Sequence, residues 1–142
     1  MADKVVDNNM EELRKAPLFS AMSDKDLGRV RSIAKVVTHE AGQHVVEEDK
    51  TAMGIHLILE GAAEASVAGV PVAQLGPGSY FGEMALIDGK PRSATVQATA
   101  TLKTLVIPSW DFNHMLDQHP DMMRGLLVEL CRRLRKIENE LG

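Results

Sequence analysis

The chain has 142 residues, a hydrophobic fraction of 44% and a charged fraction of 25%, which suit one globular domain with its own core. Its net charge of −4 argues against a nucleic-acid partner. The one cysteine excludes an internal disulfide framework, and no apolar run is long enough for a membrane span or a signal-peptide core. We therefore expect a cytoplasmic protein that binds neither membrane nor nucleic acid.

Residues 8–37 are predicted to be helical, with an interruption at Pro17. A second helix begins after Ser23, which can act as its N-cap, with Asp26 three residues later. Apolar residues follow at helical spacing, at Leu27, Val30 and Ile33. This segment is the expected helical entry of a single domain that spans residues 1–142.

Residues 38–108 have a different pattern, in which short β-rich runs alternate with glycine. Such runs are typical of an antiparallel sandwich or barrel. A hairpin turn is predicted around Gly69. Residues 83–87, with the sequence EMALI, do not alternate and contain good helix formers, so a single helical turn is predicted there.

Residues 109–141 are predicted to form two helices divided at Pro120, with Ser109 as a cap of the first. The last helix carries apolar residues at heptad spacing, at Leu127, Leu130, Leu134, Ile137 and Leu141. This seam either pairs with another helix or packs back on the β-core. The same helix has a basic cluster that is either a solvated face or a contact for an acidic partner, at Arg124, Arg132, Arg133, Arg135 and Lys136.

The stretch from Gly82 to Val96, GEMALIDGKPRSATV, carries the chemistry. Gly82 lets the backbone approach a ligand closely, and a helical turn that starts near Glu83 directs free N–H groups toward an anion. The carboxylate of Glu83 suits a neutral donor such as a sugar hydroxyl, and the guanidinium of Arg92 suits a phosphate. Ser93 adds a hydroxyl and Ala94 leaves room. Together they favour a nucleotide whose ribose and phosphate lie close together.

Residues 81–98, FGEMALIDGKPRSATVQA, resemble the phosphate-binding cassette of cyclic nucleotide-binding domains, as found in regulatory subunits of cAMP-dependent protein kinase and in the catabolite activator protein. The match is long and specific. Its signature positions are Phe81, Gly82, Glu83, Ala85, Leu86, Arg92, Ser93, Ala94, Val96 and Ala98. A weaker resemblance extends from about Ala16 to Ile137.

The resemblance implies a mainly β fold, an eight-stranded jelly-roll-like β-roll with flanking helices. It assigns the ribose 2′-hydroxyl to Glu83, and the cyclic phosphate to Arg92 and to backbone N–H groups near Ala85 and Ser93. The candidate ligand-binding residues are Phe81, Gly82, Glu83, Met84, Ala85, Arg92, Ser93 and Ala94. The family places the base against the barrel wall under the C-terminal helix, where Arg132, Leu134 or Arg135 could form a lid.

Some positions depart from the family pattern. Asp49 and Lys50 stand where a glycine and an acidic or amide residue are usual, and His56 falls in a normally apolar strand position. Ser93 resembles cAMP binders, whereas threonine there resembles cGMP-selective kinases. Ile137 and Glu138 replace the small hydroxyl residues that cap adenine in the catabolite activator protein.

We therefore expect a stand-alone sensor of cAMP that signals to a protein partner through its C-terminal helix and could form a homodimer through that helix. The alternatives are a cGMP-binding module, or a degenerate β-roll interaction protein that binds no nucleotide. For Glu83 and Arg92 the plainer interpretation is a structural salt bridge, whereas the intact pair argues against a degenerate domain. A cupin-like metal enzyme would need a close histidine pair, but His44 and His56 are twelve residues apart. No nucleophile–base arrangement is visible either, so we expect neither a metal nor an enzyme.

Overall fold

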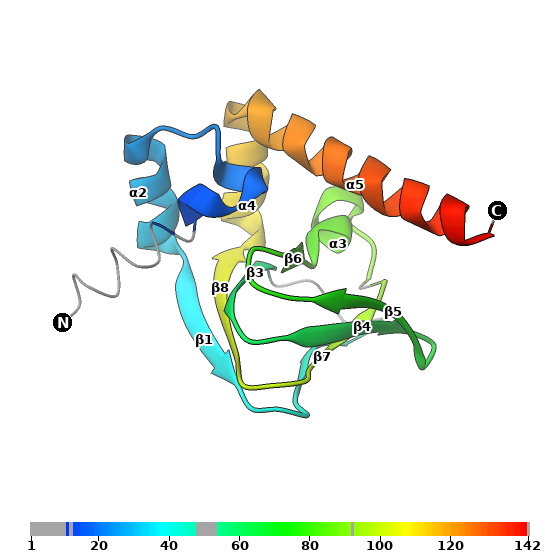
Figure 1. The fold of residues 1–142 in the computed structure, drawn as a ribbon. Helices are drawn as coiled ribbons and strands as arrows, with labels where there is room; N and C mark the ends of the chain where they lie inside the picture. The colour runs from blue at the N-terminus through cyan, green and yellow to red at the C-terminus, as the bar shows by residue number, and fades with distance from the viewer. Residues whose placement is uncertain (1–10, 12, 48–53, 92, 142) are drawn as a thin grey trace.

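The computed structural model describes residues 11, 13–47, 54–91 and 93–141. Its elements run from a helical entry through a β-roll to two exit helices (Figure 1). In chain order they are η1 (Pro17–Phe19), α2 (Asp24–Ile33), β1 (Lys35–His39), β2 (His44–Val46), β3 (Gly54–Glu60), β4 (Ala63–Val67), β5 (Val70–Leu75), β6 (Tyr80–Phe81), α3 (Glu83–Asp88), β7 (Thr95–Ala98), β8 (Leu102–Pro108), α4 (Ser109–Gln118) and α5 (Pro120–Leu141).

The entry helix α2 begins as the sequence predicts. The backbone N–H of Asp26 donates a hydrogen bond of 3.2 Å to the hydroxyl oxygen of Ser23, the N-cap. The prediction that the helical segment extends to residue 37 is wrong, because α2 ends at Ile33 and β1 starts at Lys35. The two β-branched residues that follow, Val36 and Val37, favour a strand and pair with β8.

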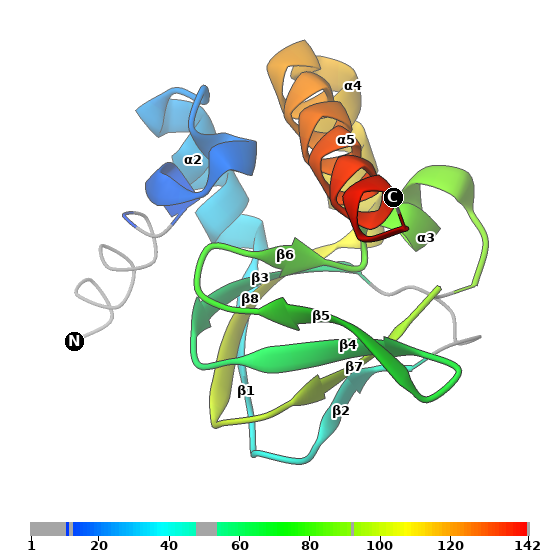
Figure 2. The same cartoon turned by 45° about the vertical axis from the view of Figure 1, so that its right-hand side comes forward.

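The described strands form two antiparallel four-stranded sheets, in the orders β1-β8-β3-β6 and β2-β7-β4-β5 (Figure 2). The first strand, β1, pairs with the last, β8, from Lys35 opposite Val106 to His39 opposite Leu102. This arrangement confirms the expected β-roll with flanking helices.

Strand β3 separates two hydrophobic cores. Its alternate residues Ile55, Leu57 and Leu59 join a helix-side core, whereas Ile58 joins a roll core between the two sheets. The rest of the helix-side core is Leu13, Ala16, Leu18, Phe19, Leu27, Val30, Ala34, Tyr80, Leu86, Leu105, Ile107, Phe112, Met115, Leu116, Met122 and Leu126. The rest of the roll core is Val46, Ala63, Ala65, Phe81, Val96, Ala98 and Leu102. Because both faces of β3 are covered, its sequence GIHLILE is nearly continuous in apolar residues.

The predicted hairpin turn is confirmed between β4 and β5. Ala68 has a φ of 51° and Gly69 a φ of 79°, the pair of left-handed conformations that a two-residue type I′ turn requires. Gly69 adopts this conformation without the cost that a β-carbon would add.

The division of the last segment at Pro120 is also confirmed, since α4 ends at Gln118 and α5 starts at Pro120. The prediction that Ser109 caps α4 is wrong. Ser109 is the first residue of α4, the N-cap is Pro108, and no side chain caps this end. The chain enters α4 directly from the end of β8, so the backbone continues from strand to helix without a capping turn.

Candidate functional site

The site is built where β6 runs into α3. Gly82 joins the two elements with a φ of 92°, which only glycine adopts without strain. The turn before β6 is fixed to β3 by two backbone hydrogen bonds of 2.9 Å, from Gly78 to the carbonyl of Ile58 and from Ile58 to the carbonyl of Ser79. The start of α3 is therefore held in place by the most buried strand of the roll. The single helical turn predicted for residues 83–87 is confirmed as α3.

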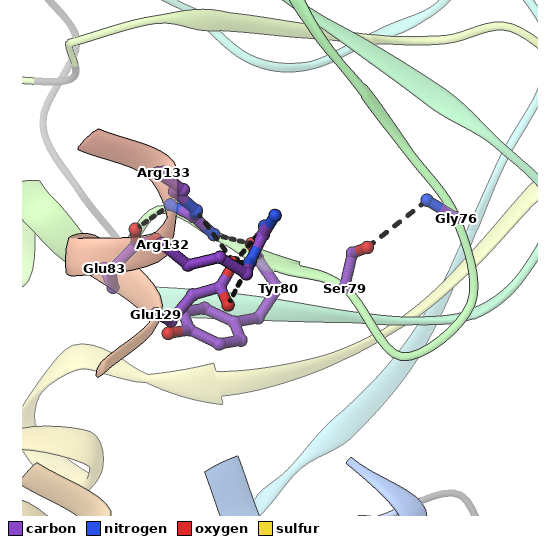
Figure 3. Close-up of polar contacts among 7 residues, drawn as sticks. All are labelled: Gly76, Ser79, Tyr80, Glu83, Glu129, Arg132 and Arg133. Carbon is purple, nitrogen blue, oxygen red and sulfur yellow. Dashed lines mark hydrogen bonds and ion pairs between the residues drawn. The ribbon is translucent and has the colours of Figure 1, made fainter. Parts of the chain in front are cut away.

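Glu83, the first residue of α3, is the buried carboxylate of the site, with 2% of its surface exposed. Its Oε1 accepts a hydrogen bond of 2.5 Å from Nη1 of Arg133, which lies fifty residues later on α5 (Figure 3). A buried carboxylate needs hydrogen-bond partners, and Arg133 supplies one of them.

Arg133 makes three more contacts around the same point. Its Nη2 donates to the backbone carbonyl of Tyr80 at 3.2 Å, and its Nε donates to Oε1 of Glu129 at 3.3 Å. Its Cζ also lies 5.3 Å from the centre of the Tyr80 ring, within cation–π range. One guanidinium therefore ties the middle of α5 to β6 and to α3 (Figure 3).

Two neighbouring groups have shifted pKa values. Burial, and then the charge of Glu83, raises the pKa of the Tyr80 hydroxyl, so this phenol stays neutral. The hydrogen bond from Arg132 is the main cause that lowers the pKa of Glu129. Glu129 is consequently an anion at neutral pH and helps to fix the two arginines of α5.

The other cassette residues lie close to this frame. Phe81 is buried and stacks on His56 with ring centres 4.8 Å apart and an angle of 1° between the planes. His56, which departs from the family pattern, thus serves as part of an aromatic wall. Met84 is exposed on α3, and its sulfur accepts a 3.8 Å contact from the Ser93 hydroxyl.

Ala85 lies within α3, and Ala94 is half-buried just before β7. Arg92, the predicted phosphate ligand, lies outside the described residues, as do Asp49 and Lys50. The described residues therefore form the part of the predicted site that surrounds the carboxylate of Glu83.

The three lid candidates lie on α5. Arg132 pairs with Glu129 at 2.5 Å, whereas Leu134 and Arg135 are exposed. A hollow of about 460 Å³ runs along this helix, and its described lining includes two of the candidates: Arg132, Arg135, Lys136, Asn139 and Glu140. Within the described residues, no hydrogen bond or ion pair joins the three candidates to the cassette.

Sequence reasoning missed Arg133 as the residue of α5 that reaches the cassette. The signal was present in the helical spacing, because Met122, Leu126, Glu129 and Arg133 recur every three or four residues and share one face. Met122 and Leu126 are buried, so this face is the one that packs on the domain. A cation at its end then needs a buried acid opposite, and Glu83 supplies it.

Within the part of the chain that the structure describes, no group of three or more His, Cys, Asp or Glu side chains could hold a metal ion. None of the described helices combines the length and the apolar character that crossing a membrane requires.

These features define a class of protein: a β-roll domain in which a glycine precedes a short helix, and in which the C-terminal helix contacts that short helix. Residues 36–119 match the family described as the cyclic nucleotide-binding domain. The chain is 35% identical over 113 residues to a cAMP-dependent protein kinase regulatory subunit of Eremothecium gossypii, a match that covers 79% of this chain and 25% of that subunit. The chain belongs to the cyclic nucleotide-binding domain family.

Solved structures agree on the fold. The structure of cAMP-bound PfPKA-R (141–441) superposes with a TM-score of 0.84 at 24% identity and covers all of this chain and 49% of that one. The catabolite activator protein of Thermus thermophilus gives a TM-score of 0.75 at 26% identity, over 88% of this chain and 61% of that one. The chain spans about a quarter to a third of the length of the curated relatives it matches.

Proposed function

We propose that this domain binds cAMP as a regulatory ligand and has no catalytic activity of its own. The observation that carries the proposal is the state of Glu83: a buried carboxylate at the start of α3, held through Oε1 by Arg133 of α5. A ribose 2′-hydroxyl is a neutral donor that would complete this carboxylate without adding charge. Membership in the cyclic nucleotide-binding domain family supports the same ligand.

Arg92 and the backbone N–H groups near Ala85 and Ser93 would hold the cyclic phosphate. These positions match the family cassette, and a guanidinium offers a phosphate two parallel hydrogen bonds. Ser93 favours adenine over guanine, by resemblance to cAMP binders. Phe81, Gly82, Met84 and Ala94 would shape the cassette, while Arg132, Leu134 and Arg135 would cover the base from α5.

The output would pass through α5 to a protein partner or to a second copy of the chain. Arg133 couples α5 to the carboxylate that the ribose would use, so a ligand at Glu83 changes the contact that holds the helix. The nucleotide shifts the helix only by as much as it prefers one helix position over the other. The cytoplasm would suit Cys131, an exposed free thiol.

Titration calorimetry of refolded, nucleotide-free protein, with cAMP and then with cGMP, tests the ligand. We expect cAMP to bind with a Kd of about 1 μM or tighter, equivalent to about −8 kcal/mol, and cGMP to bind more weakly. If cGMP binds more tightly, the base assignment is wrong. If neither ligand gives heat or a thermal shift, the domain is a β-roll scaffold that binds no nucleotide.

The Arg92→Ala variant tests the phosphate site. Charge-assisted hydrogen bonds contribute about 1.5–3 kcal/mol each, so the loss of a bidentate pair should weaken cAMP binding about a hundredfold. Lys90→Ala is the matched control, because it removes a nearby exposed cation outside the predicted ligand set. Normal binding by Arg92→Ala, or an equal loss in Lys90→Ala, would reject the site.

A further inference from the structure

The one tryptophan of the chain lies exposed on α4. Trp110 keeps 74% of its surface exposed, although the same helix buries Phe112, Met115 and Leu116 against the domain. At 100° per residue, Trp110 lies about 180° from the middle of that buried face. It therefore contributes nothing to the core. A large aromatic side chain that faces away from the core is typical of a surface that contacts another protein, because tryptophan is enriched at such contacts.

The ring of Trp110 is held in a fixed orientation. It stacks on the ring of His114, one turn later on the same helix, with ring centres 5.5 Å apart and an angle of 4° between the planes. A stacked indole has already lost rotamer freedom, so a partner that binds it has less conformational entropy to remove. The α4 outer face, which consists of Trp110, Asn113, His114 and Asp117, is thus preorganised for contact.

The surroundings of Trp110 are acidic. Between Lys103 and Arg124 the sequence has no lysine or arginine, but it has three aspartates: Asp111, Asp117 and Asp121. Asp117 is exposed seven residues after Trp110, which places it on the same side of the helix and about 10 Å further along the axis. Asp121 is exposed in the first turn of α5. This local charge repels nucleic acid and anionic lipid, and it attracts a cationic partner.

An arginine side chain complements both features of the α4 outer face. Its guanidinium stacks on an indole ring through a cation–π contact, and it also pairs with a carboxylate. A lysine would supply the charge without a plane that can stack. Three residues of an extended segment cover about 10 Å, so two arginines with this spacing would reach Trp110 and Asp117 together.

We propose that the α4 outer face docks a basic, arginine-containing segment of a partner protein. Trp110 is the aromatic anchor, His114 orients it, and Asp117 pairs with a second cation of the segment. None of these residues belongs to the candidate nucleotide site, so the contact goes beyond the proposed function and is tested separately from it. The helix that carries the surface is fixed to the domain through Phe112, which is fully buried.

Trp110 itself reports on binding, because it is the one tryptophan of the chain. A peptide of three Arg-Gly-Gly repeats is the probe, since its arginines lie about 10 Å apart when it is extended. We expect a saturable change in tryptophan fluorescence with a Kd of about 100 μM at low salt, and weaker binding as salt is added. The same peptide with lysine should bind more weakly, and with glutamate it should have no effect. No change up to millimolar peptide, or equal changes with all three peptides, would overturn the proposal.

Anisotropy of the dye-labelled arginine peptide tests the individual residues. Trp110→Ala should weaken binding about tenfold through loss of the cation–π contact, and Asp117→Asn about threefold. Glu40→Gln is the matched control, because Glu40 is an exposed acid between β1 and β2, at the end of the domain far from α4 (Figure 1). Full affinity in Trp110→Ala, or an equal loss in Glu40→Gln, would mean that the peptide responds only to the overall negative charge, and the proposal would fail.

Sedimentation equilibrium of the chain alone separates a partner protein from a second copy. The C-terminal half of α5 offers similar chemistry, with Arg132, Arg135 and Lys136 along one hollow. We expect no self-association that depends on Trp110. If the chain self-associates and Trp110→Ala abolishes that association, the occupant of the α4 outer face is a second copy, and the proposal of a different partner is wrong.

Discussion

The helix-side core and the roll core meet at β3 but differ in the size of their side chains. The roll core is built mostly from alanine and valine, whereas leucine is the commonest residue of the helix-side core, which also contains buried phenylalanine and methionine. The helix-side core fills its space and anchors the root of α5 through Met122 and Leu126. The roll core includes Phe81, which belongs to the cassette. The helix-side core therefore anchors α5, and the roll core supports the cassette where we propose that cAMP binds.

The largest effect on stability is expected for Phe112→Ala, in the helix-side core. Phe112 is fully buried on α4, so its loss should destabilise the protein by about 3–5 kcal/mol. The cAMP affinity of the molecules that remain folded should not change. Trp110→Ala, on the same helix but 74% exposed, should change stability by less than about 0.5 kcal/mol. Chemical denaturation measures both variants, and similar losses would contradict the assignment of the core.

The next test removes the contact by which Arg133 joins α5 to Glu83 at the start of α3. Arg133→Gln leaves the buried carboxylate of Glu83 without its cation, which should cost about 3 kcal/mol. Hydrogen exchange should then become faster along α5 and at the start of α3, while the roll stays protected. Arg135→Gln is the control, an exposed arginine two residues away. Unchanged exchange in Arg133→Gln would show that the contact does not hold the helix.

A substitution in the roll core should have a smaller effect on stability and a larger effect on binding. Ala65→Leu adds volume between the sheets and should cost about 1–3 kcal/mol through overpacking. It should also weaken the proposed cAMP binding, because the added volume disturbs the core that Ala65 shares with the cassette residue Phe81. Val67→Leu, on the same strand but partly exposed, should do neither. Calorimetry that finds full affinity in Ala65→Leu would show that the roll core does not support the binding site.

The smallest expected effect is the pH dependence of Glu129. Its pKa is lowered from the ordinary value of 4.5 in the folded protein, mainly by Arg132. This contribution to stability is therefore fully present above pH 4.5 and is lost as the pH falls through the lower folded pKa. Because the carboxylate is still partly exposed to solvent and its partner Arg132 is exposed, the effect should stay below about 1 kcal/mol. Denaturation between pH 6 and pH 3 should show a weaker dependence in Glu129→Gln, and an identical one would contradict the pairing.

Local patterns in the sequence predicted much of the fold. The cap at Ser23, the turn at Gly69, the helical turn at Glu83 and the division at Pro120 each depend on neighbouring residues. The start of β1 was missed because helical spacing continued into Val36, where pairing with β8 decides the structure.

Long-range contacts set the limit of prediction for the site. The cassette motif identified Glu83 as a candidate ligand residue, but its partner Arg133 lies fifty residues away. The choice between Arg133 and its neighbours depends on the rotation of α5 over the roll. Only the packed domain fixes that rotation, through Met122 and Leu126.

The pairing of β1 with β8 has a consequence for the order of folding. Within the described sheets β1 is an edge strand whose partner is β8, so residues 35–39 can find their place only when residues 102–108 are available. On the ribosome, the first strand must therefore wait until the last strand has left the exit tunnel. Such distant pairing slows folding relative to helical domains. A nascent chain that stalls before β8 would expose an unpaired strand edge, the kind of surface that chaperones protect.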